Sequence, residues 1–598
     1  MRAMRDLVMA SQCKAVAGSF PDGPIVSAGM LRRLVPVLVA VLALAGAGAA
    51  AGRIGVSAPK VATYPGSTTV TGTGVLPAGG RSLALNEPIG GGDGEMVVVS
   101  NAKKISATVD SAKLAPLRVQ LRFWHFVRFG SKLVPDALMP WDGSSIGAEQ
   151  QNQPLSVEVT VPYGTKPGSY SGSVTVTADG RATALRLTVT VFDVQLPKPG
   201  QSGNELTVFG VGPQSYVNKV IDLYHTPDAQ IRTMNQSLFG FLSAYRISPD
   251  SWGYGIPGAS GYVASSSWWK DSAGNMALQL AAGEFPDLWI PLSNNRAGGS
   301  YVAGVNPAKP STWCGYLGTI HRYWTEQGWL KSGAIPYAYP YDEPGDTHTT
   351  LLAQQAAALH KCWPGAKMLI TATPDTKMSR LYDGKGMDDV DMWAAVDWRY
   401  YGVFTSPAKQ RCCSRKHEYI QQIDKARSHG KKILAYTYNG VPGFPSFSVI
   451  EPLSNPRMFV LWTALEGIDG MLYGQGLTTY KTGNPLTGAN DSRGEGLLIY
   501  PGASAPIPSA RLEQIRDGIE DWSIFNAVRK RFGAAKVRQI LGGHGLFSAD
   551  ANGVKLACVV GCDLKGVPPQ AWPQWSHDSS TPGRIEAARL DALKAASS

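Results

Sequence analysis

The chain has 598 residues, of which 44% are hydrophobic and only 17% charged, a globular composition that excludes long charged disordered tails. One hydrophobic core is too small for this length, so we expect a large domain with at least one smaller companion. The net charge is +11, but the basic residues are scattered and no nucleic-acid-binding signature accompanies them, so nucleic acid is not an expected partner.

The N-terminal region has the residue order of an export signal. A basic pair, Arg32 and Arg33, precedes an apolar run at residues 34–44 and then a stretch of small residues. The apolar run is shorter than the roughly 20 residues that span a bilayer, so we expect no stable membrane insertion after signal removal. We assign residues 1–52 to this leader, expect translation to begin at Met30, and predict a secreted or cell-envelope protein.

Residues 53–200 have the pattern of a β-sandwich. Polar and apolar residues alternate with period two, as at residues 156–161 and 185–191. Turn-forming residues such as those at 178–180 separate the runs, and short strands at regular spacing predict an antiparallel sandwich. The Pro-Lys-Pro-Gly segment at 197–200 marks its expected end.

Residues 201–485 change to a rhythm of strand, loop and helix, which predicts a (β/α)8 barrel of the TIM type. The expected strands are 206–211, 246–252, 288–292, 335–341, 368–373, 395–400, 433–438 and 470–473. The expected helices are 229–244, 313–324, 351–362, 418–428 and 456–465. The fold class is therefore multidomain, with β followed by α/β.

Residues 486–598 are expected to form a C-terminal extension of strand and helix packed on the barrel. The segment 511–531 has an amphipathic pattern, with Arg516 and Glu520 one helical turn apart. We expect its acids, such as Asp521, to tie the helix to the barrel, which makes it scaffold rather than part of the chemistry.

Six cysteines follow the leader, which allows three disulfide bonds in an exported protein. Cys314 and Cys362 fall on two predicted neighbouring helices, so a bridge between them is expected, and Cys558 with Cys562 could close a small loop. No Cys-x-x-Cys pair or His-x-x-x-His spacing points to a metal site. We therefore expect no metal and no cofactor.

Two adjacent acids, Asp342 and Glu343, follow the predicted fourth strand and precede Pro344. In a barrel of this type the chemistry lies at the carboxyl ends of the strands. Paired carboxylates near aromatic residues are suited to general acid and base catalysis on a sugar. A regular pleat would send the neighbours to opposite faces, but a turn at Pro344 can let both acids face the barrel mouth.

The predicted seventh strand carries no acid. Glycosidases that form a covalent intermediate need a second carboxylate about 5 Å from the acid. Residues 433–439 read Ile-Leu-Ala-Tyr-Thr-Tyr-Asn. A partner carboxylate would have to come from elsewhere, such as Asp250, Asp375 or Asp397, or else a group on the substrate itself must attack.

Aromatic and polar residues near the predicted strand ends are candidates for contact with a sugar, because aromatic rings stack on sugar C–H groups. The candidate substrate-binding residues are Tyr341, Tyr339, Trp398, Tyr400, Tyr436, Tyr438, Asn439, Tyr473 and Trp252. His348 is expected at the start of a helix rather than as a catalytic base.

Three segments together resemble glycoside hydrolase family 123, the β-N-acetylgalactosaminidase group and its uncharacterised hydrolase-like relatives. They are Asp342-Glu343-Pro344, the Gly-Leu-Leu-Ile-Tyr-Pro-Gly motif at 496–502 and the segment 507–522. The resemblance implies an oligo- or polysaccharide substrate whose 2-acetamido oxygen attacks the anomeric carbon. It also implies that Glu343 protonates the leaving oxygen while Asp342 orients the acetamido nitrogen and stabilises its developing charge.

The chain departs from this family pattern after the predicted eighth strand, where Gly474 follows Tyr473 at a position for which a tryptophan is expected. This difference leaves two other interpretations open. One is a two-carboxylate glycosidase that pairs Glu343 with Asp397 or Asp250 and acts on a non-amino-sugar envelope or plant glycan. The other is a carbohydrate-binding envelope protein without turnover.

Overall fold

The computed structural model describes most of the chain after the leader. The chain divides into two units, Met1–Gly55 and Val56–Ser598, and all described residues belong to the second. The described residues are 58–199, 207–210, 213–226, 230–250, 287–290, 308–326, 328, 330, 335–375, 377–384, 389–397, 416–437, 445–474, 476–480, 483–488, 493–547 and 578–598. The predicted signal segment therefore lies outside them, as do Cys412, Cys413, Cys558 and Cys562.

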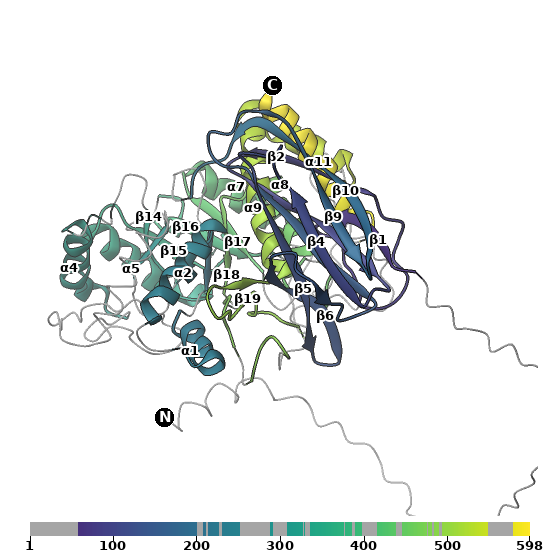
Figure 1. Cartoon of the computed structure of the whole chain (residues 1–598). Helices are drawn as coiled ribbons and strands as arrows, with labels where there is room; N and C mark the ends of the chain where they lie inside the picture. Colours follow the sequence, from purple (N-terminus) through teal and green to yellow (C-terminus); the bar gives the residue numbers. More distant parts are fainter. Residues whose placement is uncertain are drawn as a thin grey trace, which may run out of the picture. The chain divides into compact units, whose positions relative to one another are not determined.

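Two five-stranded sheets form the predicted sandwich (Figure 1). The first has the order β1 (Lys60–Pro65), β3 (Gly92–Ser100), β8 (Asn152–Thr160), β5 (Arg118–Phe129) and β6 (Lys132–Trp141). The second has the order β2 (Ser82–Ile89), β10 (Arg181–Gln195), β9 (Gly168–Ala178), β4 (Lys104–Asp110) and β7 (Ile146–Gly147).

The alternating apolar residues of both sheets meet in one core, as the period-two pattern predicted. Leu185, Leu187 and Val189 of β10 are each 0% exposed and share a cluster with Val97 and Val157 of the other sheet. The prediction of a purely antiparallel sandwich was wrong in one place, because β2 pairs with β10 in parallel. The two strands are far apart in sequence, so no hairpin turn fixes their direction.

The second architectural part is an eight-stranded parallel sheet. Its order is β12 (Ser248–Asp250), β11 (Thr207–Gly210), β18 (Gly470–Tyr473), β17 (Lys432–Tyr436), β16 (Met392–Val396), β15 (Lys367–Ile370), β14 (Ile335–Ala338) and β13 (Asp287–Ile290). The first strand along the chain, β11, pairs with the last, β18. The described residues show no pairing between the two end strands β12 and β13, so closure into a full barrel is not shown.

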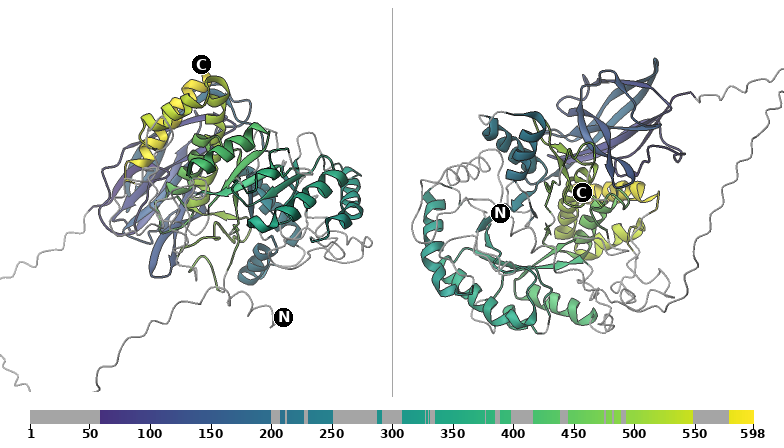
Figure 2. Two further views of the ribbon diagram at one scale, coloured as in Figure 1. Left: turned by 180° about the vertical axis from the view of Figure 1, so that it is seen from behind. Right: turned by 90° about the horizontal axis from the view of Figure 1, so that it is seen from below.

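Helices cover this sheet on the outside, as the right-hand view of Figure 2 shows for the teal and green helices. The helices of the described residues are α1 (Pro213–Tyr224), α2 (Ile231–Ala244), α4 (Trp313–Glu326), α5 (Thr349–Cys362), α7 (Lys416–Ser428), α8 (Asn455–Glu466), α9 (Ala510–Phe532), α10 (Ala534–Gly543) and α11 (Thr581–Ser597). The last of them, α11, packs on β2 and β10 of the sandwich instead. Short 3-10 turns are η3 (Pro310–Thr312), η4 (Asp346–His348) and η5 (Ser379–Leu381), and β19 (Ile499–Tyr500) pairs with β20 (Ile507–Pro508). The helices predicted from the sequence are confirmed, whereas α1, α10 and α11 were not predicted.

Within the described part of the chain, no helix combines the length and apolarity of a membrane span.

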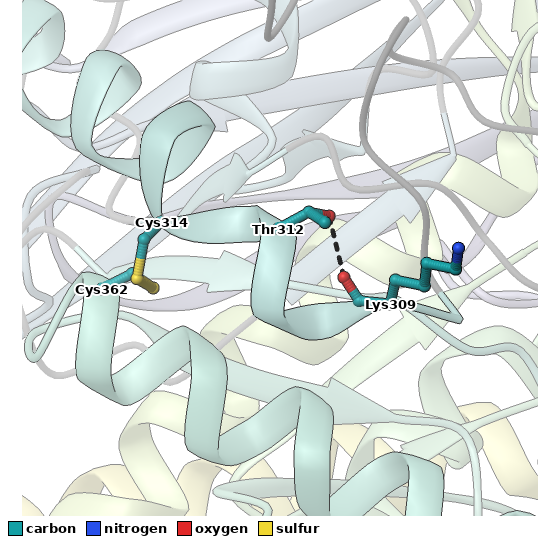
Figure 3. The surroundings of a disulfide bond; sticks show 4 residues. All are labelled: Lys309, Thr312, Cys314 and Cys362. Carbon is teal, nitrogen blue, oxygen red and sulfur yellow. Dashed lines mark hydrogen bonds between the residues drawn. A yellow bond between two sulfur atoms is a disulfide. The ribbon is translucent and has the colours of Figure 1, made fainter.

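A disulfide bond joins Cys314 in the first turn of α4 to Cys362 at the end of α5, as predicted (Figure 3). The Cα atoms of the two cysteines are 4.8 Å apart. Thr312, just before α4, donates a hydrogen bond from Oγ1 to the carbonyl oxygen of Lys309 at 2.8 Å. The disulfide bond therefore ties together α4 and α5, the helices before and after the acid-bearing strand β14 in the chain.

Helix α9 is buried on nearly all sides, so its predicted amphipathic pattern was only partly right. Its charged side chains are buried with partners: Arg511 contacts Asp136 of the sandwich at 2.8 Å, and Asp521 contacts Arg457 of α8 at 2.7 Å. The expected pair of Arg516 with Glu520 is replaced by contacts of Arg516 with Glu513 and Asp517. Glu520 instead accepts a hydrogen bond from the backbone N–H of Gly92 at 2.9 Å. The scaffold role expected for this helix agrees with these contacts.

Candidate active site

The two adjacent acids lie beyond the end of strand β14, not at its last residue. The strand ends at Ala338, earlier than the predicted limit at Tyr341. Pro340 has no backbone N–H to donate to a neighbouring strand, which explains the early end. The pleat therefore does not determine where Asp342 and Glu343 point.

The backbone of Glu343 is left-handed, with φ at 45°. This conformation costs an L-residue about 1–2 kcal/mol, because Cβ crowds the following carbonyl. The N–H of Glu343 donates a hydrogen bond to Oγ1 of Thr371 at 2.7 Å. Because Glu343 is left-handed, the two acids do not point to opposite faces as neighbours in a strand would. Both acids are half-buried.

Two hydroxyl groups contact the carboxylate of Asp342. Tyr339 Oη donates to Asp342 Oδ1 at 2.5 Å, and Thr371 Oγ1 lies 3.1 Å from the same oxygen. The two hydroxyl groups are 2.8 Å apart. Burial and the nearby Asp342 charge raise the pKa of Tyr339 well above its ordinary value, so its hydroxyl stays protonated and remains a donor.

The carboxylate of Glu343 has a different partner. Tyr436, the last residue of β17, donates a hydrogen bond from Oη to Glu343 Oε1 at 2.9 Å. Thr371 directly follows β15. The carboxyl ends of β14, β15 and β17 thus bring one cluster together: Tyr339, Asp342, Glu343, Thr371 and Tyr436.

Two other predicted substrate-binding residues lie in different surroundings. The ring of Tyr341 lies 4.5 Å from the ring of His348, which is in η4 just before α5, as expected. Tyr473 is 1% exposed, packs on Phe447, and accepts a hydrogen bond from the N–H of Gly496 at 3.1 Å. In this structure the Tyr473 ring therefore serves packing and offers no exposed face to a sugar.

Gly474, the residue that follows Tyr473, is exposed. A Cβ atom at Gly474 would meet nothing within 4 Å among the described atoms. Five other predicted residues lie outside the described part of the chain: Trp252, Trp398, Tyr400, Tyr438 and Asn439.

The alternative carboxylates are also at strand ends or in turns. Asp375 accepts hydrogen bonds from the N–H groups of Lys377 and Met378, both at 2.9 Å, and burial raises its pKa. Asp397 directly follows β16 and is 1% exposed. Asp250 is the last residue of β12, and its side chain is not among those that the structure describes.

Thr371 was not among the residues selected from the sequence. A weak signal was present, because Thr371 and Thr373 are polar residues directly after an apolar strand. In a parallel sheet such positions lie at the same edge as the other strand ends. The sheet order, which places β15 beside β14, was needed to connect Thr371 with the acids.

Comparisons with known proteins give a family match and a structural match over most of the chain. Residues 299–528 match the family model described as glycoside hydrolase 123, catalytic domain. The structure is similar to a family 123 glycoside hydrolase from Clostridium perfringens, solved in a study of glycolipid glycan hydrolysis, with a TM-score of 0.58 and 12% identity over 90% of this chain and 98% of that one. No curated protein sequence matches the chain.

Two further solved structures are much less similar. An endo-β-1,4-mannanase from Thermotoga petrophila has a TM-score of 0.32 and 14% identity over 55% of this chain and 78% of that one. A GH10 xylanase with a bacterial Ig-like domain from termite gut has a TM-score of 0.28 and 10% identity over 73% and 99%. The segment matched by the family model contains the whole cluster of Tyr339, Asp342, Glu343, Thr371 and Tyr436. Residues 299–528 are therefore similar to the catalytic domain of glycoside hydrolase family 123, which indicates a glycosidase.

Proposed function

We propose that this glycosidase uses Glu343 as general acid and base and Asp342 as the assisting carboxylate, on a substrate with a 2-acetamido sugar. One observation carries the proposal: two adjacent acids are held by different hydroxyl donors where three parallel strands end. Glu343 is bound by Tyr436, and Asp342 by Tyr339 and Thr371. Different surroundings are what two carboxyl groups need in order to take different roles.

In the proposed reaction the substrate supplies the nucleophile. The acetamido carbonyl oxygen bonds to the anomeric carbon as the glycosidic bond breaks, and protonated Glu343 gives its proton to the leaving oxygen. Asp342 accepts a hydrogen bond from the acetamido N–H and stabilises the positive charge that develops there. Glu343 then removes a proton from water, whose oxygen bonds to the anomeric carbon and opens the cyclic intermediate with retention of configuration.

The seventh strand of the sheet supports substrate assistance. Strand β17 presents the hydroxyl of Tyr436 to Glu343 and carries no acid in Lys432–Tyr436. A two-carboxylate mechanism on another glycan remains the second candidate, because Asp397 lies buried at the end of β16, between β15 and β17 in the sheet order. In that case Asp397 or Asp250 would act as the nucleophile or base.

The proposal also includes closure of the parallel sheet into a barrel, export of the protein and room for a bulky glycan. Seven successive parallel pairings, including the first strand with the last, support a closed barrel in which β12 and β13 also meet. The basic, apolar and small-residue order of the leader supports export to the cell surface or beyond. The open position at Gly474 would leave room for a bulky glycan beside the site.

Glu343→Gln tests the proposal directly. The variant keeps the shape of the side chain but cannot transfer a proton, so we expect kcat on aryl 2-acetamido-2-deoxy-β-glycosides to fall about 100- to 10,000-fold. The loss should be smallest with the most acidic leaving group, which needs the least protonation. Glu326→Gln on the exposed end of α4 is the matched control and should retain wild-type activity, because Glu326 is 61% exposed.

A thiazoline mimic of the cyclic intermediate separates the mechanisms. Strong inhibition supports attack by the acetamido oxygen, whereas a lack of inhibition together with hydrolysis of non-amino glycans supports the two-carboxylate candidate. If neither the wild type nor Glu343→Gln releases sugar while both bind the same polymer, the chain is a binding protein and the catalytic assignment is wrong.

A further inference from the structure

We propose that Thr371 is a positioning residue that sets the geometry of both acids at once. It directly follows β15, is 8% exposed, and comes from the strand next to the acid-bearing strand β14. Its Oγ1 atom is within hydrogen-bond distance of Glu343 N, Asp342 Oδ1 and Tyr339 Oη. The inference rests on the catalytic roles proposed above for Asp342 and Glu343.

The directions of these hydrogen bonds follow from the available protons. The N–H of Glu343 can only donate, so it uses a lone pair of the Thr371 hydroxyl. The single hydroxyl proton of Thr371 can then go to Asp342 Oδ1 directly or to Tyr339 Oη, which donates its own proton to Asp342 Oδ1. In both arrangements a directional chain runs from the Glu343 peptide to the Asp342 carboxylate, and such chains strengthen each bond.

The chain connects the backbone of one acid to the side chain of the other. The left-handed backbone at Glu343 is unfavourable by itself, and a hydrogen bond from its N–H to a buried side chain holds it in place. The same hydroxyl lies next to Oδ1 of Asp342, which limits rotation of that carboxylate. A change at Thr371 should therefore misplace both acids without removing either.

Thr371→Val tests this role because valine has nearly the same shape as threonine and lacks the hydroxyl. We expect kcat on the aryl 2-acetamido-2-deoxy-β-glycoside to fall about 10- to 100-fold, because small misplacements of reacting groups are costly, while KM changes little. Thr371→Ser restores the hydroxyl and should recover kcat to within about threefold of wild type.

Thr373→Val is the matched control. Thr373 is also 8% exposed and lies two residues further along the same segment, but its Oγ1 has no hydrogen-bond partner among the described residues. The same loss of a hydroxyl should therefore leave kcat unchanged. Equal losses in Thr371→Val and Thr373→Val would mean that general packing, not positioning, explains the effect.

The outcomes separate this inference from the proposed function when Glu343→Gln is assayed beside them. If Glu343→Gln is inactive while Thr371→Val keeps wild-type kcat, the positioning role is wrong and the catalytic role stands. If Glu343→Gln and the wild type are equally active, the proposed function fails. If Thr371→Val does not fold, Thr371→Ala removes the same hydroxyl with a smaller side chain, and wild-type kcat in that variant overturns the inference.

Discussion

At the scale of single residues, the two acids are contacted by hydroxyl groups of different residues. Tyr436 donates to Glu343, while Tyr339 donates to Asp342, so the two carboxylates are oriented by separate groups from different strand ends. Sequence reasoning could select these four residues, since each lies near the end of a predicted strand. It could not select Thr371, because one threonine after a short strand is common and only the order of strands places it beside the acids.

Tyr436→Phe should lower kcat by about tenfold. The variant keeps the ring and removes one hydrogen bond to a charged group, which is worth roughly 1.5–3 kcal/mol, part of which a water molecule can replace. Steady-state hydrolysis of the aryl glycoside measures the effect. Tyr170→Phe is the control, because its hydroxyl donates a hydrogen bond to the backbone carbonyl of Lys166 in the sandwich. A Tyr436→Phe enzyme with wild-type kcat would show that this contact does not orient Glu343 for catalysis.

At the scale of elements, the period of the hydrophobic pattern located strands and helices well and their ends less well. Strand β18 has its predicted limits, Gly470–Tyr473, whereas β16 begins at Met392, three residues before its predicted start. The apolar run Met392–Val396 is bounded by Asp391 and Asp397, so the sequence does mark the limits of β16, and the predicted strand was placed too far along the chain. Pairing with β15 and β17 falls within these limits.

The partners of the buried charges around α9 could not be predicted, because they come from distant parts of the chain. Arg589 of α11 contacts Glu87 at 2.9 Å and Asp521 at 2.9 Å, and Arg457 contacts Asp93 at 3.3 Å. In sequence, charged residues on a helix indicate an exposed face. Here each arginine is at most 1% exposed and links the sandwich to the C-terminal helices.

Arg589→Met should destabilise the protein by about 3–5 kcal/mol, because it leaves buried carboxylates without their guanidinium partner. The midpoint of urea unfolding, compared with wild type at the same pH, measures this change. Arg322→Met is the control. Arg322 is 72% exposed and forms an exposed ion pair with Glu326, so its removal should cost less than about 1 kcal/mol. Similar midpoints for the two variants would contradict the structural importance of the buried cluster.

At the scale of the whole second unit, a hairpin of the sandwich contacts the segment that follows the last parallel strand. His125 of β5 lies 2.6 Å from Glu149 through Nδ1 and 2.9 Å from the carbonyl oxygen of Leu486 through Nε2. Both partners accept hydrogen bonds, so the ring satisfies them only when both nitrogens are protonated. The hydrogen bond to Glu149 raises the pKa of His125 above its ordinary value of 6.5.

This contact predicts a pH-dependent contribution to stability. A histidine whose pKa is raised by folding stabilises the native state fully below its unfolded value, and the contribution is lost as the pH rises through the folded value. We expect the difference in Tm between wild type and His125→Phe to be largest near about pH 5.5 and to shrink near about pH 8.5. The exposed His429→Phe serves as control, and a pH-independent difference for His125→Phe would contradict the prediction.

The contacts of the sandwich with the rest of the chain also bear on how the enzyme could be shortened or recombined. Asp93, Glu87 and Asp136 belong to the sandwich, yet they neutralise arginines of α8, α9 and α11. A fragment that begins after residue 200 would lose these sandwich carboxylates and leave those arginines with fewer counter-charges. The N-terminal part is therefore unsuitable as an exchangeable accessory module, and transplanting the hydrolytic part into another protein requires taking both pieces together.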